Sequence, residues 1–461
     1  MIADLKPYPE YKELGLPWLS QVPSHWAQRR MKFLFTERVE KGFPDEPLLA
    51  ATQSKGVVRK EDYGSRTVTA TKDFHLLKLV DVGDFVISLR SFEGGIEVAH
   101  CRGIISPAYT VLAPKREATQ SYYSHLFKSR DFINSLTLFV TGIREGQNID
   151  YERLSRAYMP LPPEEEQVAI GKFLDWANGR LERTIRAKRK VIALLNEQKQ
   201  AIIHRAVTRG LDPSVPLKPS GIPWLGDIPQ HWEVRRVKQA TSILRGKFTH
   251  RPRNDPSLYD GKYPFIQTGV VARATKFIAG YSQTLNEKGL AVSKMFPSGT
   301  LVMTIAANIG EVAVLTFDAC FPDSIVGFVP SENIDRDYLY LVFRCMKSEL
   351  MREAPVNTQG NLNIERIGAM GIPFPSRKEQ EKIAEHVETE SVPLDNAISR
   401  LEREIELLRE YRTRLVADVV TGKLDVREAA ACLPDQMTEP DAEIDDVEAD
   451  DTEDDLSEEA A

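Results

Sequence analysis

Two strand-like segments of this 461-residue chain, VGDFVI and LVMTIA, are followed by polar residues, and two turn-like segments carry further ones. Polar side chains that project from loops or helix starts can hydrogen-bond to the edges of nucleic-acid bases. The plainer interpretation of each is a solvated loop residue. The candidates for base contacts are Gln53, Lys55, Arg90 and Ser91 in the first half of the chain, and Gln267, Thr268 and Asn308 in the second.

Two pairs of arginines are candidates for a different contact, because binding to phosphate requires little more than positive charge. Arg29 and Arg30 follow one tryptophan, and Arg235 and Arg236 follow another in the second half. The alternative is that these arginines only solvate the edge of a strand. The tryptophans beside them are expected to pack in a core.

Motifs of catalysis are missing from the sequence. The four Gly-Lys pairs lack the glycine that a phosphate-binding loop carries five residues earlier, and HExxH does not occur. Neither DPPY nor NPPY, with which adenine methyltransferases hold the target base, is present. The four cysteines never form CxxC, so neither a zinc cluster nor a disulfide framework is expected. The sequence therefore predicts a chain that recognises a ligand without a catalytic site, metal or cofactor of its own.

An internal repeat indicates which elements must position the candidate residues. GLPWLSQVPSHWAQRRMK at residues 15–32 returns as GIPWLGDIPQHWEVRRVK at residues 221–238, with ten of eighteen positions identical. A second repeat matches PLPPEEEQVAI at residues 160–170 with PFPSRKEQEKI at residues 373–383, and its register continues for about fifty residues. A period of more than two hundred residues predicts two duplicated domains. The chain thus alternates a variable block with a repeated segment, twice.

The second repeat has the pattern of a long helix with an apolar seam. Apolar residues recur at alternating steps of four and three, which is typical of coiled coils. Prolines stand at both helix entrances, and Gly210 and Gly422 stand at the exits. Two helices of equal length and register favour pairing with each other over packing of each on its own domain. The seam residues are Leu181, Ile185, Lys188, Ile192, Leu195, Lys199, Ile202 and Ala206, and Leu394, Ile398, Leu401, Ile405, Leu408, Arg412, Leu415 and Val419.

Antiparallel pairing of these helices would relate the two variable blocks by a pseudo-two-fold axis. The seam would span about 39 Å at the rise of an α-helix. One turn of B-DNA is about 34 Å, so two similar readers could address two half-sites on one face of a duplex.

The charge of the chain is divided unevenly. The segment from residue 435 to 461 holds 14 of the 67 acidic residues and none of the 60 basic ones, so the preceding residues carry a net charge of +7. A basic body favours a polyanionic partner such as DNA. An acidic segment poor in apolar residues is expected to be disordered. No run of apolar residues is long enough to span a membrane, and no leader is visible, so we expect a cytoplasmic location.

The order of two variable blocks and two repeated helices, with TGIREGQNIDYERL, MPLPPEEEQ and GDFVISLRSFEGG, resembles the DNA-specificity subunits of type I restriction-modification systems. The resemblance covers residues 1 to about 424. It implies that each variable block is a target-recognition domain for one half of a split site in double-stranded DNA. It also implies that the helices dock two methyltransferase (modification) subunits, which bind S-adenosylmethionine and methylate adenine. Restriction motor-nuclease subunits would complete the enzyme, and the acidic segment has no role in this resemblance.

We therefore predict an α+β fold with two similar globular target-recognition domains, separated by two long helices in an antiparallel coiled coil. The predicted function is sequence-specific recognition of a bipartite DNA site by a non-catalytic specificity subunit. The alternatives are the specificity subunit of a fused restriction-methylation enzyme and a coiled-coil scaffold that binds no DNA. The predicted domains are 1–160 and 212–373 for target recognition, 161–211 and 374–424 for the spacer helices, and 425–461 for the acidic tail.

Overall fold

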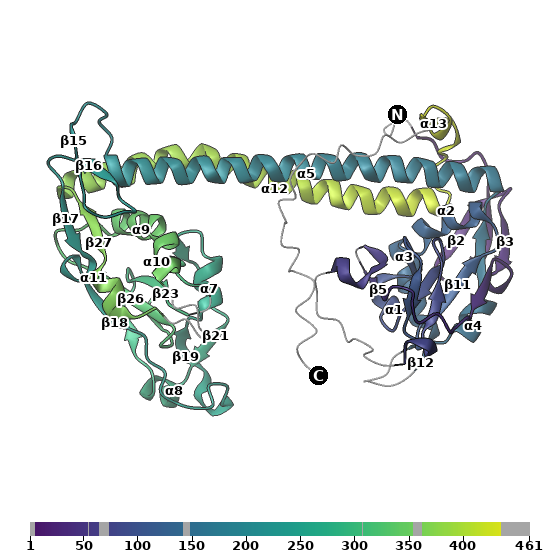
Figure 1. Cartoon of the computed structure of the whole chain (residues 1–461), viewed down its shortest axis with the longest axis horizontal. Coiled ribbons are helices and arrows are strands. Elements are labelled where there is room, and N and C mark those ends of the chain that lie inside the picture. Colours follow the sequence, from purple (N-terminus) through teal and green to yellow (C-terminus); the bar gives the residue numbers. More distant parts are fainter. Residues whose placement is uncertain are drawn as a thin grey trace. The chain divides into compact units, whose positions relative to one another are not determined.

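The computed structural model describes residues 5–53, 55–63, 73–141, 148–306, 308–353 and 362–434, and it divides into two compact units (Figure 1). Unit 1 comprises Met1–Ala187 and Glu404–Ala461, and unit 2 comprises Lys188–Arg403. Both units combine small β-sheets with helices, so the predicted α+β class is confirmed. The acidic segment after residue 434 lies outside the described residues.

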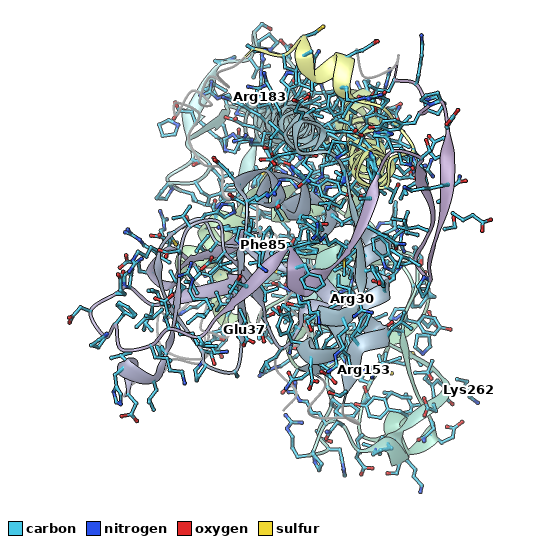
Figure 2. The ribbon with its side chains drawn as sticks, turned by 90° about the vertical axis from the view of Figure 1, so that its right-hand side faces the viewer. Arg30, Glu37, Phe85, Arg153, Arg183 and Lys262 are labelled. Carbon is cyan, nitrogen blue, oxygen red and sulfur yellow. The ribbon has the colours of Figure 1, made fainter. Side chains whose placement is uncertain are left out.

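Unit 1 is built around a four-stranded antiparallel sheet of order β4-β11-β8-β9. Phe85 of β8 (Figure 2) is fully buried. Its ring meets the rings of Phe35 and Phe127 edge to face. Burial of these rings joins the sheet to the helices that cover it. The strands are β1 (Tyr11–Leu16), β2 (Leu19–Pro23), β3 (Ala27–Arg30), β4 (Phe35–Arg38), β5 (Leu49–Thr52), β6 (Gly56–Arg59), β7 (Lys78–Val80), β8 (Phe85–Ile87), β9 (Glu97–Val98), β10 (Gly103–Ile105), β11 (Thr110–Pro114), β12 (Val140–Thr141), β13 (Asn148–Ile149) and β14 (Tyr158–Leu161). The short helices are α1 (Ser91–Gly94), α2 (Glu117–Leu126), α3 (Arg130–Leu136), α4 (Tyr151–Arg156) and α13 (Arg427–Ala431).

Unit 2 contains a five-stranded sheet of order β18-β26-β23-β24-β20 and a four-stranded sheet of order β21-β19-β25-β22. In this sheet β23 pairs with β24 on one side and with β26 on the other. In unit 1, β8 pairs in the same way with β9 and with β11, so the two sheets resemble each other. The strands are β15 (Leu217–Pro219), β16 (Asp227–Pro229), β17 (Glu233–Arg236), β18 (Thr241–Arg245), β19 (Tyr259–Phe265), β20 (Phe277–Ile278), β21 (Gln283–Leu285), β22 (Met295–Phe296), β23 (Leu301–Thr304), β24 (Val312–Leu315), β25 (Ala319–Cys320), β26 (Ile325–Pro330) and β27 (Gly371–Phe374). The short helices are α6 (Val237–Ala240), α7 (Thr268–Arg273), α8 (Glu287–Ala291), α9 (Arg336–Cys345), α10 (Lys347–Glu353) and α11 (Ile364–Ala369).

Two long helices correspond to the repeated segments. They are α5 (Glu164–Arg209) and α12 (Arg377–Val420), and each contributes to both units. Within unit 1, Arg412 of α12 donates to Glu182 of α5, and within unit 2, Lys199 of α5 donates to Asp395 of α12. The two helices are therefore neighbours in each unit.

The predicted seam agrees with the burial along both helices. All sixteen seam residues are buried or half-buried, whereas Arg183, Glu197 and Arg403 between them are exposed. In unit 1, Leu415 and Val419 join the same apolar core as Phe173. Apolar burial between the helices is thus the interaction that the heptad pattern predicts.

Pro393 lies inside α12, where the sequence pattern gives no sign of a break. Proline lacks the amide proton of the helical hydrogen bond and costs about 3 kcal/mol in a helix interior. The Pro393 side chain is exposed, and α12 continues through this residue.

Among the described residues, no helix has the length and apolar character needed to cross a membrane.

Candidate nucleic-acid interface

A glutamate in the first turn of each long helix fastens that helix to its unit. In unit 1, Glu166 Oε1 accepts a hydrogen bond of 2.7 Å from Trp26 Nε1, and its Oε2 lies 2.7 Å from His25 Nε2. In unit 2, Glu379 Oε1 accepts a hydrogen bond of 2.9 Å from Trp232 Nε1. We call these two Trp-Glu pairs the helix anchors. They explain why the His-Trp segment and the helix start recur together in the sequence.

The same tryptophans also contact the ends of the opposite helices. Gly422, after α12, has a φ of +75°, and a Cβ there would lie 3.1 Å from Trp26 Cη2 and 2.4 Å from Pro23 Cδ. Gly210, after α5, has a φ of +71°, and a Cβ there would lie 3.1 Å from Trp232 Cζ2. A left-handed glycine ends each helix where a side chain would collide. Each tryptophan therefore joins the start of one long helix to the end of the other within its unit.

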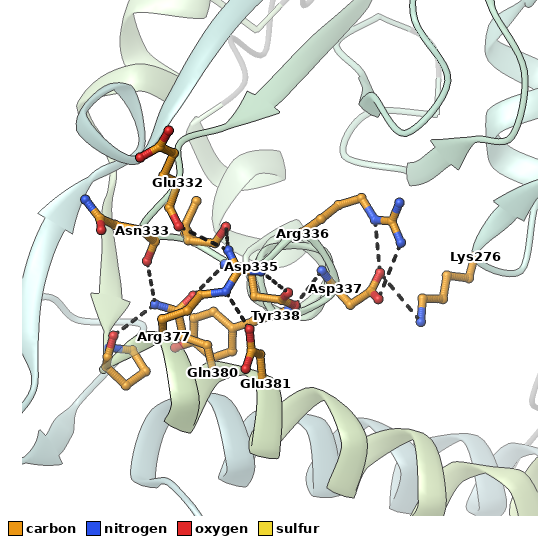
Figure 3. Close-up of polar contacts among 12 residues, drawn as sticks. Lys276, Glu332, Asn333, Asp335, Arg336, Asp337, Tyr338, Arg377, Gln380 and Glu381 are labelled. Atoms are coloured by element: carbon orange, nitrogen blue, oxygen red, sulfur yellow. Dashed lines mark hydrogen bonds and ion pairs between the residues drawn. The ribbon is translucent and has the colours of Figure 1, made fainter.

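A glutamine next to each anchor satisfies backbone groups at the helix start. Gln380 Nε2 donates to the carbonyl of Pro375 at 2.9 Å, and its Oε1 accepts from the Asp335 amide at 2.7 Å (Figure 3). In unit 1, Gln167 Nε2 donates to the carbonyl of Pro162 at 2.8 Å. The repeated Glu-Gln pair therefore has a structural role at the helix start in both units. The loops between the repeats take no part in this role, so their sequences can differ between the units.

Three of the four base-contact candidates of unit 1 are exposed on two adjoining loops. Gln53 and Lys55 lie in the turn between β5 and β6, and Arg90 directly precedes α1. The side chain of Gln53 covers Gly94 of α1 so closely that a Cβ on Gly94 would lie 2.6 Å from Gln53 Cγ. The structure therefore brings the β5–β6 turn and the loop of Arg90 into one surface.

Ser91 is the exception among these candidates. Only 1% of the residue is exposed, and its hydroxyl oxygen accepts a hydrogen bond of 2.8 Å from the Ser88 amide. In this structure Ser91 therefore has almost no surface available to a base, and its predicted base contact stays a prediction. The hydroxyl instead closes the turn that precedes α1.

The candidates of unit 2 divide between a groove and a separate loop. Gln267 and Thr268, at the start of α7, line a groove of about 360 Å³. Asn308 is exposed in the loop between β23 and β24 and is not one of the lining residues. That loop corresponds to the one that carries Arg90 in unit 1, since both connect neighbouring antiparallel strands of the main sheet.

The groove also holds polar side chains that we did not predict from the sequence. Arg253 belongs to them, and Asp323 fixes its guanidinium through an ion pair. These residues come from separate loops and strands, so no contiguous motif indicated them. The additional polar lining residues are Arg253, Asn254, Tyr259, Gln283 and Ser324.

The four arginine candidates lie on matching strands, β3 and β17. Arg29, Arg30 and Arg236 are exposed. The guanidinium of Arg30 stands 5.3 Å from the ring centre of Tyr158. The guanidinium of Arg235 stacks 4.0 Å from the ring of Phe374 and bonds to a neighbouring carboxylate, so its charge is partly engaged within unit 2.

Comparisons with known proteins agree with this architecture. Residues 229–407 match the model of the type I restriction modification DNA specificity domain. The MjaVIII specificity subunit of Methanocaldococcus jannaschii is 26% identical over 343 residues, which are 71% of this chain and 75% of that protein. The putative MjaX specificity subunit of the same organism is 22% identical over 438 residues, which are 89% of this chain and 96% of that protein.

A solved structure shares the fold. One of its chains aligns with a TM-score of 0.64 at 16% identity, over 87% of this chain and 99% of that chain. That structure is described as the basis of complex assembly and conformational transition of the type I R-M system.

The duplicated anchors, the loops that differ between the units and these similarities define a DNA-specificity protein. Residues 229–407 match the DNA specificity domain of type I restriction-modification systems, and the chain is similar to their specificity subunits over most of its length. The function that these similarities support is recognition of a DNA sequence without catalysis by this chain.

Proposed function

We propose that unit 1 reads one half of a bipartite DNA site and that unit 2 reads the other half. The duplicated helix anchors carry this proposal. Glu166 with Trp26 and Glu379 with Trp232 make the same contacts, yet the sheets and loops between the repeats differ. Two similar supports for two different sets of loops are what recognition of two different half-sites requires.

Exposed polar side chains supply the contacts in this proposal. Side chains at loop tips read base edges, and arginines on β3 and β17 contact phosphates. Base contacts are assigned to Gln53, Lys55 and Arg90 in unit 1, and to Gln267, Thr268, Asn308 and the groove residue Arg253 in unit 2. Phosphate contacts are assigned to Arg29, Arg30 and Arg236. Arg235 is assigned a weaker phosphate contact, because its guanidinium already stacks on Phe374.

The partners complete the reaction in this proposal. Two methyltransferase subunits bind S-adenosylmethionine and methylate adenine, and restriction motor-nuclease subunits join them on the DNA. The repetition of α5 and α12 supports two copies of one partner, because equivalent surfaces bind equivalent partners. The chain itself contributes recognition, and the cofactor belongs to the methyltransferase subunits.

A replacement of one variable block tests this division. Residues 33–146 are exchanged for the matching block of a relative, the complex is produced in cells, and methylated adenines are mapped by single-molecule sequencing. We expect one half of the methylated motif to change and the other half to stay. The matched control exchanges residues 239–359 and should change only the second half. A change in both halves after either exchange would refute the assignment of one half-site to each unit.

The alternative of a scaffold that binds no DNA is separated by a gel shift with mixed-sequence duplex. Neutralisation of phosphates by Lys and Arg releases counterions, so the affinity should fall linearly with salt on logarithmic axes. An absence of binding at low salt would favour the scaffold. A fused restriction-methylation partner would instead be recognised as one polypeptide that co-purifies with the chain.

A further inference from the structure

A lysine in unit 1 joins the two loops that carry the candidate base contacts. Lys128 lies between α2 and α3, and its Nζ donates to the carbonyl of Gln53 at 2.9 Å and to the carbonyl of Gly94 at 2.7 Å. It also donates to Glu97 Oε1 at 2.6 Å. One ammonium group thus fixes the β5–β6 turn, the end of α1 and the first residue of β9.

Glu97 occupies a position where a carboxyl group is costly without a partner. Its side chain is 5% exposed, whereas that of Lys128 is 35% exposed. Burial raises the pKa of Glu97 to about 7, and Lys128 acts in the opposite direction. A buried carboxylate is retained only when it is paired and hydrogen-bonded. Its position at the end of the loop that carries Arg90 therefore indicates a role in the shape of that loop.

Unit 2 contains the same pair in the same place. Lys347 directly follows the α9–α10 junction and donates to Glu311 Oε1 at 2.5 Å. Glu311 is the last residue of the β23–β24 loop, and Glu97 is the first residue after the β8–β9 loop. A Cβ on Gly310 would lie 3.2 Å from Lys347 Cγ, so the loop backbone packs against the lysine stem.

The sequences around the two pairs also match. Glu97 begins Glu-Val-Ala, as Glu311 does, and Lys128 begins Lys-Ser, as Lys347 does. Lysine follows glutamate by 31 residues in unit 1 and by 36 residues in unit 2, so a fixed-offset comparison does not reveal the repeat. The variable blocks, which otherwise differ between the units, therefore share this Lys-Glu ion pair.

We propose that Lys128 with Glu97, and Lys347 with Glu311, are positioning residues that hold the β8–β9 and β23–β24 loops in the geometry required for base contacts. The proposal rests on the assignment of one half-site to each unit. Neither pair is assigned a contact with DNA. Each acts through the loop beside it, and each therefore controls selectivity in one half-site only.

The test replaces both members of one pair by methionine, because removal of the lysine alone would leave a buried unpaired carboxylate. The two double variants are Lys128→Met with Glu97→Met, and Lys347→Met with Glu311→Met. Each double variant is the control for the other. The full chain is assembled with its methyltransferase subunits. Methylation rates are then measured on a DNA library that contains every single base-pair change in both half-sites.

We expect each double variant to lose discrimination at one or more positions of its own half-site, by roughly tenfold, since a good base contact contributes about 1–3 kcal/mol. Discrimination in the other half-site should stay within the error of the wild type. A general loss of structure would lower the rates on all substrates without this division. The single variant Lys128→Arg keeps Glu97 and a positive charge opposite it. Selectivity in this variant close to that of the wild type would support the ionic contact.

Unchanged selectivity in both folded double variants would overturn the proposal, and so would an equal loss in both half-sites. If the unit 1 variant does not fold, the unit 2 pair, with both side chains about a third or more exposed, decides the test alone. The block replacement distinguishes the two failures. A block replacement that leaves the methylated motif unchanged refutes the proposed function. If the block replacement changes one half of the motif but the double variants keep wild-type selectivity, only the positioning role is refuted.

Discussion

Removal of Glu166 should destabilise unit 1 more than removal of Glu379 destabilises unit 2. Glu166→Ala leaves two donors without an acceptor, the Trp26 indole and the Tyr8 hydroxyl, and both residues are almost fully buried. Each buried polar group that loses its partner costs about 1–3 kcal/mol, so the expected loss of unfolding free energy is about 2–6 kcal/mol. Burial also raises the pKa of Tyr8, so this hydroxyl keeps its proton and its need for an acceptor.

Glu379→Ala removes a weaker anchor. It leaves one buried donor, the Trp232 indole, because the His231 side chain is 52% exposed and can bond to water. The expected loss is about 1–3 kcal/mol. Glu165→Ala is the control, since Glu165 is an exposed acid in the same helical turn as Glu166 and should change stability by less than about 0.5 kcal/mol.

The assay combines urea unfolding with amide hydrogen exchange. Exchange reports the opening of each segment separately, so it does not require a single two-state transition of the whole chain. Glu166→Ala should speed exchange in β2, β3 and the first turns of α5, and Glu379→Ala should do so in β16, β17 and the first turns of α12. If Glu166→Ala costs no more than Glu165→Ala, or speeds exchange equally in both units, the account of the anchors is wrong.

Three further predictions follow from single residues. Pro393→Ala should raise the unfolding free energy of α12 in unit 2 by up to about 3 kcal/mol, measured by thermal melting, and a lower melting temperature would contradict it. The raised pKa of Glu97 means that the folded state binds this proton more tightly, so its contribution to stability should fall as the pH rises from about 4.5 to about 7. Comparison with Glu97→Gln across that range isolates the effect, and a rising difference would contradict the sign. Arg29→Ala should weaken binding to all duplexes and reduce the salt slope by about one, whereas Gln267→Ala should alter sequence preference and leave the slope unchanged. The opposite pattern in titrations over a salt series would exchange their roles.

The long helices could be predicted because their signal is periodic and local. The alternation of apolar residues along α5 and α12 identified all sixteen buried or half-buried seam positions. Gly210 and Gly422 marked the helix ends, since a left-handed residue at that place favours glycine. The anchors were visible only as two repeats, because the hydrogen bond from Trp26 to Glu166 spans 140 residues of sequence.

The candidate site was less predictable because its residues meet through tertiary contacts. Ser91 follows a strand like an exposed loop residue, but the first turn of α1 directs its hydroxyl to the Ser88 amide. The groove of unit 2 gathers Arg253 and Gln283 from separate segments, which periodicity does not relate. The Lys-Glu pairs were missed because Lys347 follows Glu311 by 36 residues, whereas Lys128 follows Glu97 by only 31.

The most direct test of two half-sites read by two units is a map of methylated adenines in cells that carry this chain with its methyltransferase subunits. Single-molecule sequencing would reveal the motif without any assumption about its sequence. The account predicts one bipartite motif, with two defined half-sites separated by an unread gap of fixed length. A single continuous motif, or a gap that varies from site to site, would contradict it.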